Sequence, residues 1–310
     1  AGAWDHAWPQ NGEAMNTKPA SRKPHSVSVV VTTFNWPEAL AKTLRALAAQ
    51  QTLPGEVIVA DDGSGPATRD CVERIARDYP IPLHHCWQPD QGFRAALCRN
   101  RAIAAASGEY VILLDGDMVP HPAFVADHLA AARRNTFVQG MRVLTDADGR
   151  DRLLASDAYT LGFFDPGIRR RRHALRLPWL SRCIAAVSPS TSLKAIKTCN
   201  QAWWREDLVA LNGFDERYEG WGREDVDLAV RAIRLGIRRR SLRFAGLASH
   251  LYHPERHDGE TSANDALIFE TKHGRRTRSL LGLDRHLETA DRALLPDLAS
   301  SAGGEHANAA

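Results

Sequence analysis

Residues 109–120 read Glu-Tyr-Val-Ile-Leu-Leu-Asp-Gly-Asp-Met-Val-Pro, and this stretch decides the fold. The apolar run from Tyr110 to Leu114 has the length of a buried strand, and it ends at Asp115 and Asp117, with one glycine between them. Two carboxylates at the end of a buried strand repel each other and lose hydration. A divalent cation removes both penalties, and these oxygen ligands suit Mg²⁺ or Mn²⁺. The alternative is a turn that carries two solvated aspartates.

Upstream of this stretch, strands and helices alternate. Apolar and β-branched runs predict the strands, and apolar residues at helical spacing predict the helices. The predicted elements are strands at 26–32, 56–60 and 83–87 and helices at 37–51, 68–78 and 91–107. Connections of this length dictate parallel strands, right-handed crossovers and helices on both faces. The predicted class is therefore α/β, with a mainly parallel, Rossmann-like sheet flanked by helices.

Polar segments follow the first, second and fourth of these strands. They are Thr33-Phe34-Asn35, Asp61-Asp62-Gly63-Ser64 and Asp115-Gly116-Asp117. Ligands of such sheets bind beyond the carboxyl ends of the strands, so we expect all three segments to line one crevice. An aspartate of the second segment could accept a hydrogen bond from the imide of a uracil or from a ribose hydroxyl. The alternative is an Asx turn that caps the next helix.

The chain beyond residue 120 is harder to interpret. We expect a helix at 121–135, a strand at 137–144, a turn at 146–149 and an irregular segment that could form a flap at 150–190. A helix at 226–235 closes at Gly236, and residues 275–310 suggest a helix and a frayed end. The predicted organisation is a loose tail at 1–24, one domain at 25–274 that divides at residue 140, and a C-terminal tail from 275.

The segment Trp221-Gly222-Arg223-Glu224-Asp225 leads into the helix at 226–235. Glycines around Trp221 allow a flat ligand to approach closely. Carboxylates at a helix N-terminus are stabilised by the helix dipole, which is one sufficient reason for Glu224 and Asp225. The other interpretation makes an aspartate here a general base beside an acceptor hydroxyl. Asp227 continues the acidic run, and we expect it to face solvent.

His250 and His253 follow a short strand-like segment. An imidazole can add a nitrogen ligand to a cation held by carboxylates, and Mn²⁺ tolerates this better than Mg²⁺. A lone histidine is more often structural. Two histidines three residues apart favour one metal ligand here without showing which of them it is.

The composition excludes several classes of function. The chain has 310 residues and a net charge of +3, which argues against a dedicated nucleic-acid-binding protein. The arginine runs at 169–172 and 238–240 fit a solvated surface, or an anionic acceptor or membrane. No apolar run approaches the ~20 residues of a membrane span, and we find no export signal. The five cysteines form no CxxC pair and are expected to be free thiols in a reducing compartment.

Taken in order, these segments resemble family 2 of the inverting glycosyltransferases, which have the GT-A fold. The resemblance rests on residues 29–35, 57–64, 91–100 and 113–118, and on Asn212-Gly-Phe-Asp215 followed by residues 220–227. The last two segments are similar to the acceptor side of galactosyltransferases and chondroitin polymerases. The resemblance covers roughly residues 26 to 255. Arg223 departs from the family pattern, which commonly has glycine there, and residues 150–190 match nothing that we can place.

The resemblance implies a metal ion, Mn²⁺ or Mg²⁺, and a UDP-sugar donor. It assigns the donor side to Thr33, Asn35, Asp61, Asp62 and Arg99, and Trp221 joins these as a candidate. Asp115 would contact ribose or metal, and Asp117 would bind the metal. His250 fits the family's metal histidine, and His253 is a close rival. Asp225 would be the base, and Glu224 would bind the acceptor or the sugar.

The implied activity is transfer of a hexosyl or N-acetylhexosaminyl group to a hydroxyl of a glycan or glycolipid. The resemblance and the arginine runs together suggest surface polysaccharide or lipopolysaccharide assembly in the cytoplasm, at the inner face of an anionic membrane. A phosphotransferase with an aspartyl nucleophile is one alternative, but Met118 stands where that chemistry needs Ser or Thr. A nucleotidyltransferase would need a basic, glycine-rich first loop. The third alternative is a nucleotide-sugar-binding module without catalysis.

Overall fold

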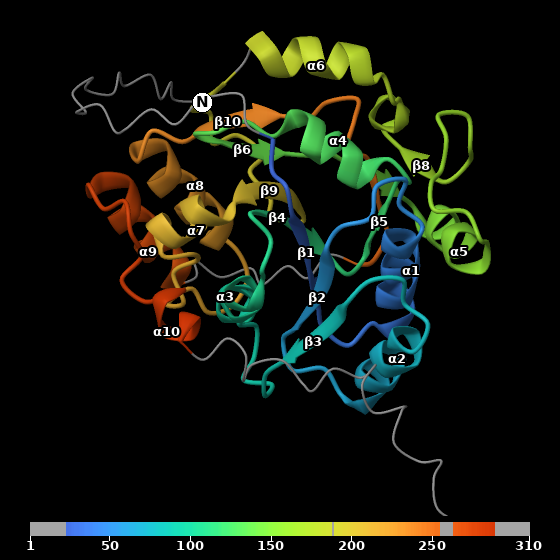
Figure 1. Ribbon diagram of the computed structural model, residues 1–310, viewed down its shortest axis with the longest axis horizontal. Coiled ribbons are helices and arrows are strands. Elements are labelled where there is room, and N and C mark those ends of the chain that lie inside the picture. Colours follow the sequence, from blue (N-terminus) through green and yellow to red (C-terminus); the bar gives the residue numbers. More distant parts are fainter. Residues whose placement is uncertain (1–22, 188, 255–262, 289–310) are drawn as a thin grey trace, which may run out of the picture.

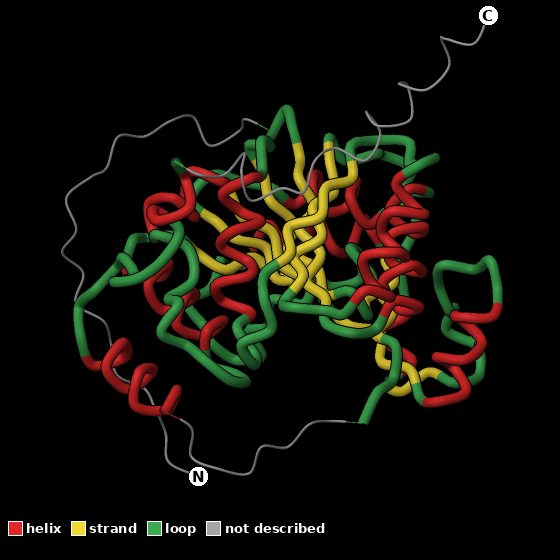
Figure 2. Tube along the Cα trace, turned by 90° about the horizontal axis from the view of Figure 1, so that it is seen from below, coloured by secondary structure: helices red, strands yellow, loops and turns green. Residues whose placement is uncertain are grey.

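The structure is a computed structural model that describes residues 23–187, 189–254 and 263–288. A seven-stranded sheet has the order β10-β6-β9-β4-β1-β2-β3, and a four-stranded sheet has the order β5-β11-β7-β8 (Figure 1). Strands gather in the centre of the molecule with helices on both sides (Figure 2). The predicted α/β class with a mainly parallel sheet flanked by helices is confirmed.

The elements have the following bounds. The strands are β1 (Val27–Thr33), β2 (Glu56–Asp61), β3 (Leu83–Trp87), β4 (Tyr110–Asp115), β5 (Met118–Pro120), β6 (Thr136–Gln139), β7 (Arg142–Thr145), β8 (Ile168–Arg169), β9 (Asn200–Trp204), β10 (Arg238–Ser241) and β11 (Ala248–His250). The helices are α1 (Pro37–Ala48), α2 (Pro66–Ala76), α3 (Ala95–Ala105), α4 (Phe124–Ala131), α5 (Ala147–Ala155), the 3₁₀ turn η1 (Arg171–Ala174), α6 (Pro178–Val187), α7 (Arg205–Leu211), α8 (Glu224–Arg234), α9 (Ala263–His273) and α10 (Asp284–Leu287).

The first four strands form the predicted parallel unit. β1 lies between β2 and β4, and β3 lies outside β2, all parallel. Thr33 is in register with Asp61, and Thr32 is in register with Asp115. The three polar segments therefore leave the sheet side by side, as predicted. β9 returns antiparallel between β4 and β6, which makes the sheet mixed.

The β1 strand is buried on both faces because helices cover both sides of the sheet. Val29 and Val31 pack in a cluster that includes residues of α1, α2 and α4. Val30 packs in a second cluster with residues of α3, α7 and α8. All three valines are completely buried, which explains why the sequence of this strand is a continuous apolar run.

The strand predicted at 137–144 is wrong as a single element. The strand is interrupted at Gly140, so that β6 joins the large sheet and β7 joins the small one. A Cβ atom on Gly140 would lie 2.2 Å from the side-chain oxygen of Asn200. Asn200 also accepts a hydrogen bond from the Gly140 N–H and donates to Met141. This crossing depends on a residue that is distant in sequence, so an apolar pattern could not reveal it.

The turn predicted at 146–149 is also wrong, because helix α5 begins there. Asp146 is its N-cap and accepts a hydrogen bond from the Gly149 N–H at 3.0 Å. An aspartate three residues before a glycine fits both a turn and a helix start, and the sequence alone did not distinguish them. The irregular segment predicted at 150–190 contains most of α5 as well as β8, η1 and α6, so that prediction is wrong as well.

Part of the predicted domain organisation falls on residues that the structure leaves out. Residues 1–22 and 289–310 lie outside the described residues. Residues 275–288 include the short α10, and Leu283 is buried against the second core cluster. No helix in the described segments is long and apolar enough to cross a membrane. All five cysteines are free, and Cys183 alone among them is exposed.

The prediction that Asp227 faces solvent is wrong, because its side chain is completely buried. Arg231, one helical turn later, donates to Asp227 at 2.8 Å and to the carbonyls of Leu211 and Gly213. Thr271 of α9 donates to the other oxygen of Asp227. This buried pair fixes the start of α8 against α7 and α9.

We expect Arg231→Leu to destabilise the fold by about 3–5 kcal/mol, because it leaves the buried Asp227 charge and two carbonyls without their donors. Urea unfolding followed by circular dichroism measures this loss. The control is Arg238→Leu, at an exposed position. Equal unfolding midpoints for Arg231→Leu and the wild type would contradict the assigned role.

Candidate active site

Asn35 ties together the loops that follow β1 and β2. Its backbone has a positive φ of 48°, a conformation that asparagine tolerates better than most residues. Its N–H donates to the Ser64 hydroxyl at 2.8 Å, and its side-chain oxygen accepts from the Gly65 N–H at 2.9 Å. Thr33, two residues before it, is buried at the end of β1. These bonds hold the loop after β1 against the loop after β2.

Asp61, the last residue of β2, is completely buried. One of its oxygens accepts from the Ser64 N–H at 2.7 Å, and the other lies 2.9 Å from Nε2 of His85. His85 comes from β3 and is itself buried. Each oxygen of the carboxylate therefore has a protein partner, and its bond to the Ser64 N–H fixes the conformation of the loop from Asp62 to Ser64.

Asp62 lies one position further along, and its two oxygens accept from the Gln88 amide at 2.7 Å and the Arg94 N–H at 2.9 Å. Burial raises the pKa of Asp62 to about 6, although both hydrogen bonds oppose the shift. Sequence analysis did not identify Gln88 or Arg94. The Gln91-Gly-Phe-Arg94 segment was part of the family resemblance, so the sequence did indicate that this segment belongs to the site.

Arg99 of α3 connects the ends of β1 and β4 to the start of α8. It is buried and donates to Thr32 at 3.2 Å, to Glu224 at 3.0 Å and to Asp115 at 3.4 Å. Glu224 is 125 residues away in sequence. A single guanidinium with its fork of donors can satisfy groups on three elements, which a lysine could not do with the same geometry.

Glu224 and Asp225 occupy the first turn of α8. Glu224 is buried. Its Oε1 atom accepts from Arg99, whereas its Oε2 atom has no hydrogen-bond partner in the described part of the chain. Asp225 is partly exposed and accepts from the Val226 N–H. Burial, followed by the charge of Glu224, raises the pKa of Asp225 to about 7. An aspartate with a pKa near neutrality is suited to take up a proton.

Asp117, His250 and His253 form a three-residue cluster. One ligand atom from each lies within 4.8 Å of the others. Oδ2 of Asp117 is 3.4 Å from Nε2 of His250 and 3.2 Å from Nε2 of His253. Oδ1 of Asp117 is buried and has no hydrogen-bond partner among the residues that the structure describes. Burial lowers the pKa of His250, which favours the neutral imidazole that a metal needs.

Asp115 does not belong to this three-residue cluster, but lies against Arg99. Desolvation raises its pKa to about 6, and the Arg99 charge opposes this shift while the Asp117 charge adds to it. The two carboxylates of the motif thus have different partners. Asp117 lies with the histidines, and Asp115 lies with the arginine that reaches Glu224.

Trp221 lies in a strained loop directly before α8. Gly220, Gly222 and Arg223 all have positive φ angles, and Arg223 is the residue that departs from the family's glycine. Its guanidinium donates to Asp265 of α9 at 2.8 Å. The Trp221 side chain is 65% exposed. The loop therefore presents a flat apolar surface to solvent at the start of the helix that carries Asp225.

A family model described as glycosyl transferase family 2 matches residues 28–188 of this chain. That match spans more than half of the chain and includes the first three loops of the crevice. The chain belongs to glycosyl transferase family 2. The family resemblance predicted from the sequence is therefore confirmed.

A second family model covers the other side of this family 2 glycosyltransferase. It is described as the N-terminal domain of galactosyltransferase and matches residues 180–255. The matched segment carries Glu224, Asp225 and His250. The two matches together therefore cover both sides of the crevice.

Curated relatives of the chain include a hyaluronan synthase from Pasteurella multocida. The two are 29% identical over 226 residues, which is 68% of this chain and 23% of the relative. The chain spans between about a quarter and a half of the length of the first three curated relatives that it matches.

Two similar solved structures share the fold of this family 2 member. TarS 1–349 from S. aureus in complex with UDP-GlcNAc has a TM-score of 0.55 at 17% identity, over 86% of this chain and 72% of that one. The mannosyltransferase PcManGT from Pyrobaculum calidifontis, in complex with GDP-Man and Mn²⁺, has a TM-score of 0.52 at 21% identity, over 94% and 80%. The predicted GT-A architecture is thus confirmed.

Proposed function

We propose that this chain is a metal-dependent, inverting glycosyltransferase that moves a sugar from a UDP-sugar to a hydroxyl of a glycan or glycolipid. The observation that carries the proposal is the Asp117, His250 and His253 cluster. It is linked to the raised-pKa carboxyl of Asp225 through Asp115, which contacts Arg99, since the Arg99 charge acts on Asp225. Arg99 joins the two sides through Asp115 and Glu224. This arrangement supports donor binding and proton transfer in the same place.

The residues of the cluster fit a divalent cation. Oδ1 of Asp117 is buried with no protein partner, which is costly unless a ligand occupies it. One carboxylate and two imidazoles form a mixed donor set that suits Mn²⁺ better than Mg²⁺. Asp117 and one or both histidines would hold the ion. When bound, the ion would neutralise charge on the departing diphosphate.

The nucleotide would occupy the side of the crevice formed by the first two loops. Asp62 would receive the base or ribose, since each of its oxygens accepts one hydrogen bond and can accept another. Thr33 and Asn35 would line the same side of the crevice, and Asp61 would position it through Ser64. Trp221 offers a flat surface for the sugar. The UDP-GlcNAc and GDP-Man complexes of the similar structures support a nucleotide-sugar as the donor.

Chemistry at the acceptor follows from Asp225. Its carboxylate takes the proton of the acceptor hydroxyl, and the acceptor oxygen forms a bond to the anomeric carbon. The bond from that carbon to the diphosphate oxygen breaks on the opposite face, and UDP leaves with the electron pair. The transition state is oxocarbenium-like, as in glycoside hydrolysis, and an α-linked donor gives a β-linked product. Glu224, with Oε2 unpaired, would bind a hydroxyl of the acceptor or the sugar.

The raised pKa of Asp225 predicts the pH dependence of transfer. Below about pH 7 the carboxyl is protonated and cannot accept a proton, so kcat/KM should fall about tenfold per pH unit. Above that pH the carboxylate is charged, and the profile should level off. Initial rates from pH 5.5 to 9 at saturating Mn²⁺ measure this. A profile that is flat across pH 6 to 8 would contradict the base assignment.

The donor is tested with a panel of UDP-sugars and GDP-mannose in the presence of Mn²⁺. At equal ligand concentration, tighter binding raises the unfolding temperature more, so a UDP-sugar should give the largest shift. UDP release from that donor then separates an enzyme from a module that only binds. A larger shift with GDP-mannose would refute the choice of uridine, and binding without release under any acceptor would favour the non-catalytic alternative.

We place the reaction, as part of this proposal, in the assembly of a surface polysaccharide at the cytoplasmic face of a membrane. Support comes from the hyaluronan synthase among the relatives and from the exposed arginine run at 169–172. The acceptor would be a growing glycan or a glycolipid.

A further inference from the structure

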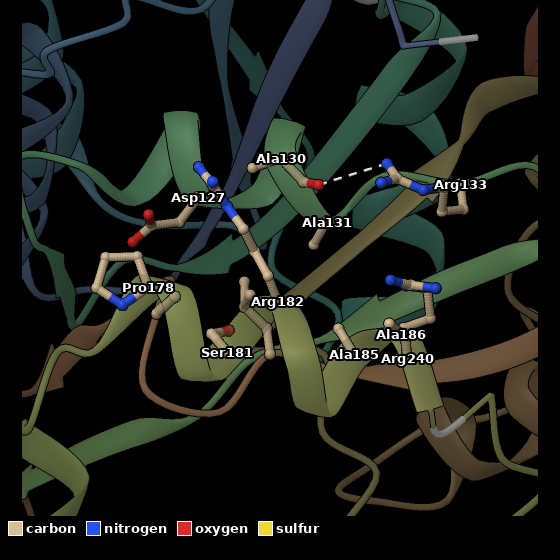
Figure 3. Close-up of a pocket in the computed structure, with 12 residues that line it drawn as sticks. Asp127, Ala130, Ala131, Arg133, Pro178, Ser181, Arg182, Ala185, Ala186 and Arg240 are labelled. Carbon is tan, nitrogen blue, oxygen red and sulfur yellow. Dashed lines mark hydrogen bonds between the residues drawn. The ribbon is translucent and has the colours of Figure 1, made fainter. Parts of the chain in front are cut away.

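A pocket of about 280 Å³ lies between α4, α6 and β10. Its polar lining comes from Asp127 and Arg133 at α4, Ser181 and Arg182 on α6, and Arg240 on β10 (Figure 3). None of these residues belongs to the candidate active site. Helix α6 lies along the outer edge of the molecule, over α4 and the β6–β10 end of the sheet (Figure 1).

The three arginines of the pocket have no carboxylate partner among the described residues. Arg133 donates to the main-chain carbonyls of Ala130 and Ala132. The guanidinium groups of Arg182 and Arg240 make no hydrogen bond or ion pair within the described segments. Burial, followed by the positive charge of Arg133, lowers the pKa of Arg240. Three cationic groups therefore share one pocket without a compensating charge.

Asp127 is the acidic residue of the lining, and its charge is already neutralised. Arg176 donates to its two oxygens at 3.1 and 2.7 Å, and the Gly246 N–H donates at 2.9 Å. The side chain is 7% exposed. A carboxylate that is saturated in this way does not compensate the other arginines, so the pocket carries a net positive charge.

Two buried polar atoms of the lining have no partner among the described residues. Ser181 is 2% exposed and its hydroxyl makes no hydrogen bond there, and Arg240 is 9% exposed and its Nε atom makes none. Buried polar groups in folded proteins almost always have a partner. Neither atom has exposed surface in this structure, so an anion between α6 and β10 would supply acceptor oxygens for them once the two side chains shift toward it.

We propose that this pocket binds a phosphate group. Guanidinium groups pair with phosphate oxygens through forked hydrogen bonds, and a serine hydroxyl adds a neutral donor. The phosphate could belong to a lipid headgroup or to a soluble phosphate. Trp179, on the same helix, is 66% exposed, and Leu177 just before the helix is 36% exposed. Exposed apolar side chains beside a cationic pocket favour the headgroup of an anionic lipid.

The test uses the full chain and the variants Arg182→Gln and Arg240→Gln. Arg238→Gln is the matched control, because it removes the same charge from the same strand outside the pocket. Calorimetry measures binding of inorganic phosphate. Sedimentation measures binding to phosphatidylcholine vesicles with and without phosphatidate. Each pocket variant should weaken phosphate binding about tenfold, since a charged hydrogen-bonding group is lost, and the control should not.

The vesicle arm decides the source of the phosphate group. Binding to phosphatidate vesicles that falls in Arg182→Gln and in Trp179→Ala assigns a lipid headgroup. Phosphate binding with no vesicle binding assigns a soluble ligand. The proposal is overturned if the wild-type chain binds neither probe, or if Arg238→Gln weakens binding as much as the pocket variants do. Arg182 is exposed, so its variant remains informative even if Arg240→Gln fails to fold.

Discussion

Replacing Asp225 with asparagine is expected to lower kcat by about 10³-fold while the affinity for UDP stays unchanged. The amide keeps the size and one hydrogen-bonding oxygen of the carboxylate but cannot accept the proton of the acceptor hydroxyl, and general bases contribute of this order. UDP does not contact the base in the proposed arrangement. Initial-rate kinetics and a UDP titration by calorimetry measure the two quantities separately.

A helix-dipole role for Asp225 makes a different prediction, so a matched control separates the two. Asp148 is an exposed carboxylate in the first turn of α5, away from the crevice. Asp148→Asn should cost ~0.3–1 kcal/mol of stability at most and leave the rate unchanged. If Asp225→Asn behaves like Asp148→Asn, with full turnover, the base lies elsewhere.

The second large effect is expected at the metal site. Asp117→Asn should weaken Mn²⁺ binding by about 100-fold or more, since residues that merely orient a ligand already cost 10–100-fold. Asp115→Asn makes the same chemical change two residues away. It should reduce Mn²⁺ affinity far less, because Asp115 lies outside the three-residue cluster. Electron paramagnetic resonance measures the concentration of free Mn²⁺, and it therefore gives the Mn²⁺ affinity of both variants without requiring turnover.

Two further variants identify the histidine ligand. His250 is the less exposed of the two, at 16% against 41% for His253, and its pKa is lowered by burial. We therefore expect His250→Ala to reduce Mn²⁺ affinity more than His253→Ala. Wild-type affinity in Asp117→Asn would refute the site as a whole, whichever histidine contributes.

The sequence predicted the half of the fold that is built from local signals. Strands β1, β2 and β4 are mainly apolar runs because both faces of the sheet are covered, and their ends carry the polar loops. Parallel connections then force those loops together, so Asn35, Asp62 and Asp115 were found from order alone. The same argument predicted the crevice but not the partners of each side chain.

What escaped prediction depends on contacts between distant residues. The break at Gly140 exists because Asn200 fills the space above it, and no local pattern encodes that contact. The buried pair of Asp61 and His85 joins two strands, and each residue alone suggests a solvated loop or a structural histidine. The apolar, arginine-rich segment at 150–190 has weak periodicity because its elements are short and only partly covered.

Arg99 has a consequence for how tightly two substrates bind in each other's presence. Its guanidinium contacts Asp115 at the end of β4 and Glu224 at the start of α8, so a change of charge or position at one carboxylate alters the field at the other. Two sites joined through one shared cation are thermodynamically linked, and linkage is reciprocal. In the proposed enzyme, a donor that strengthens acceptor binding must itself be held more tightly, by the same factor, once the acceptor is in place.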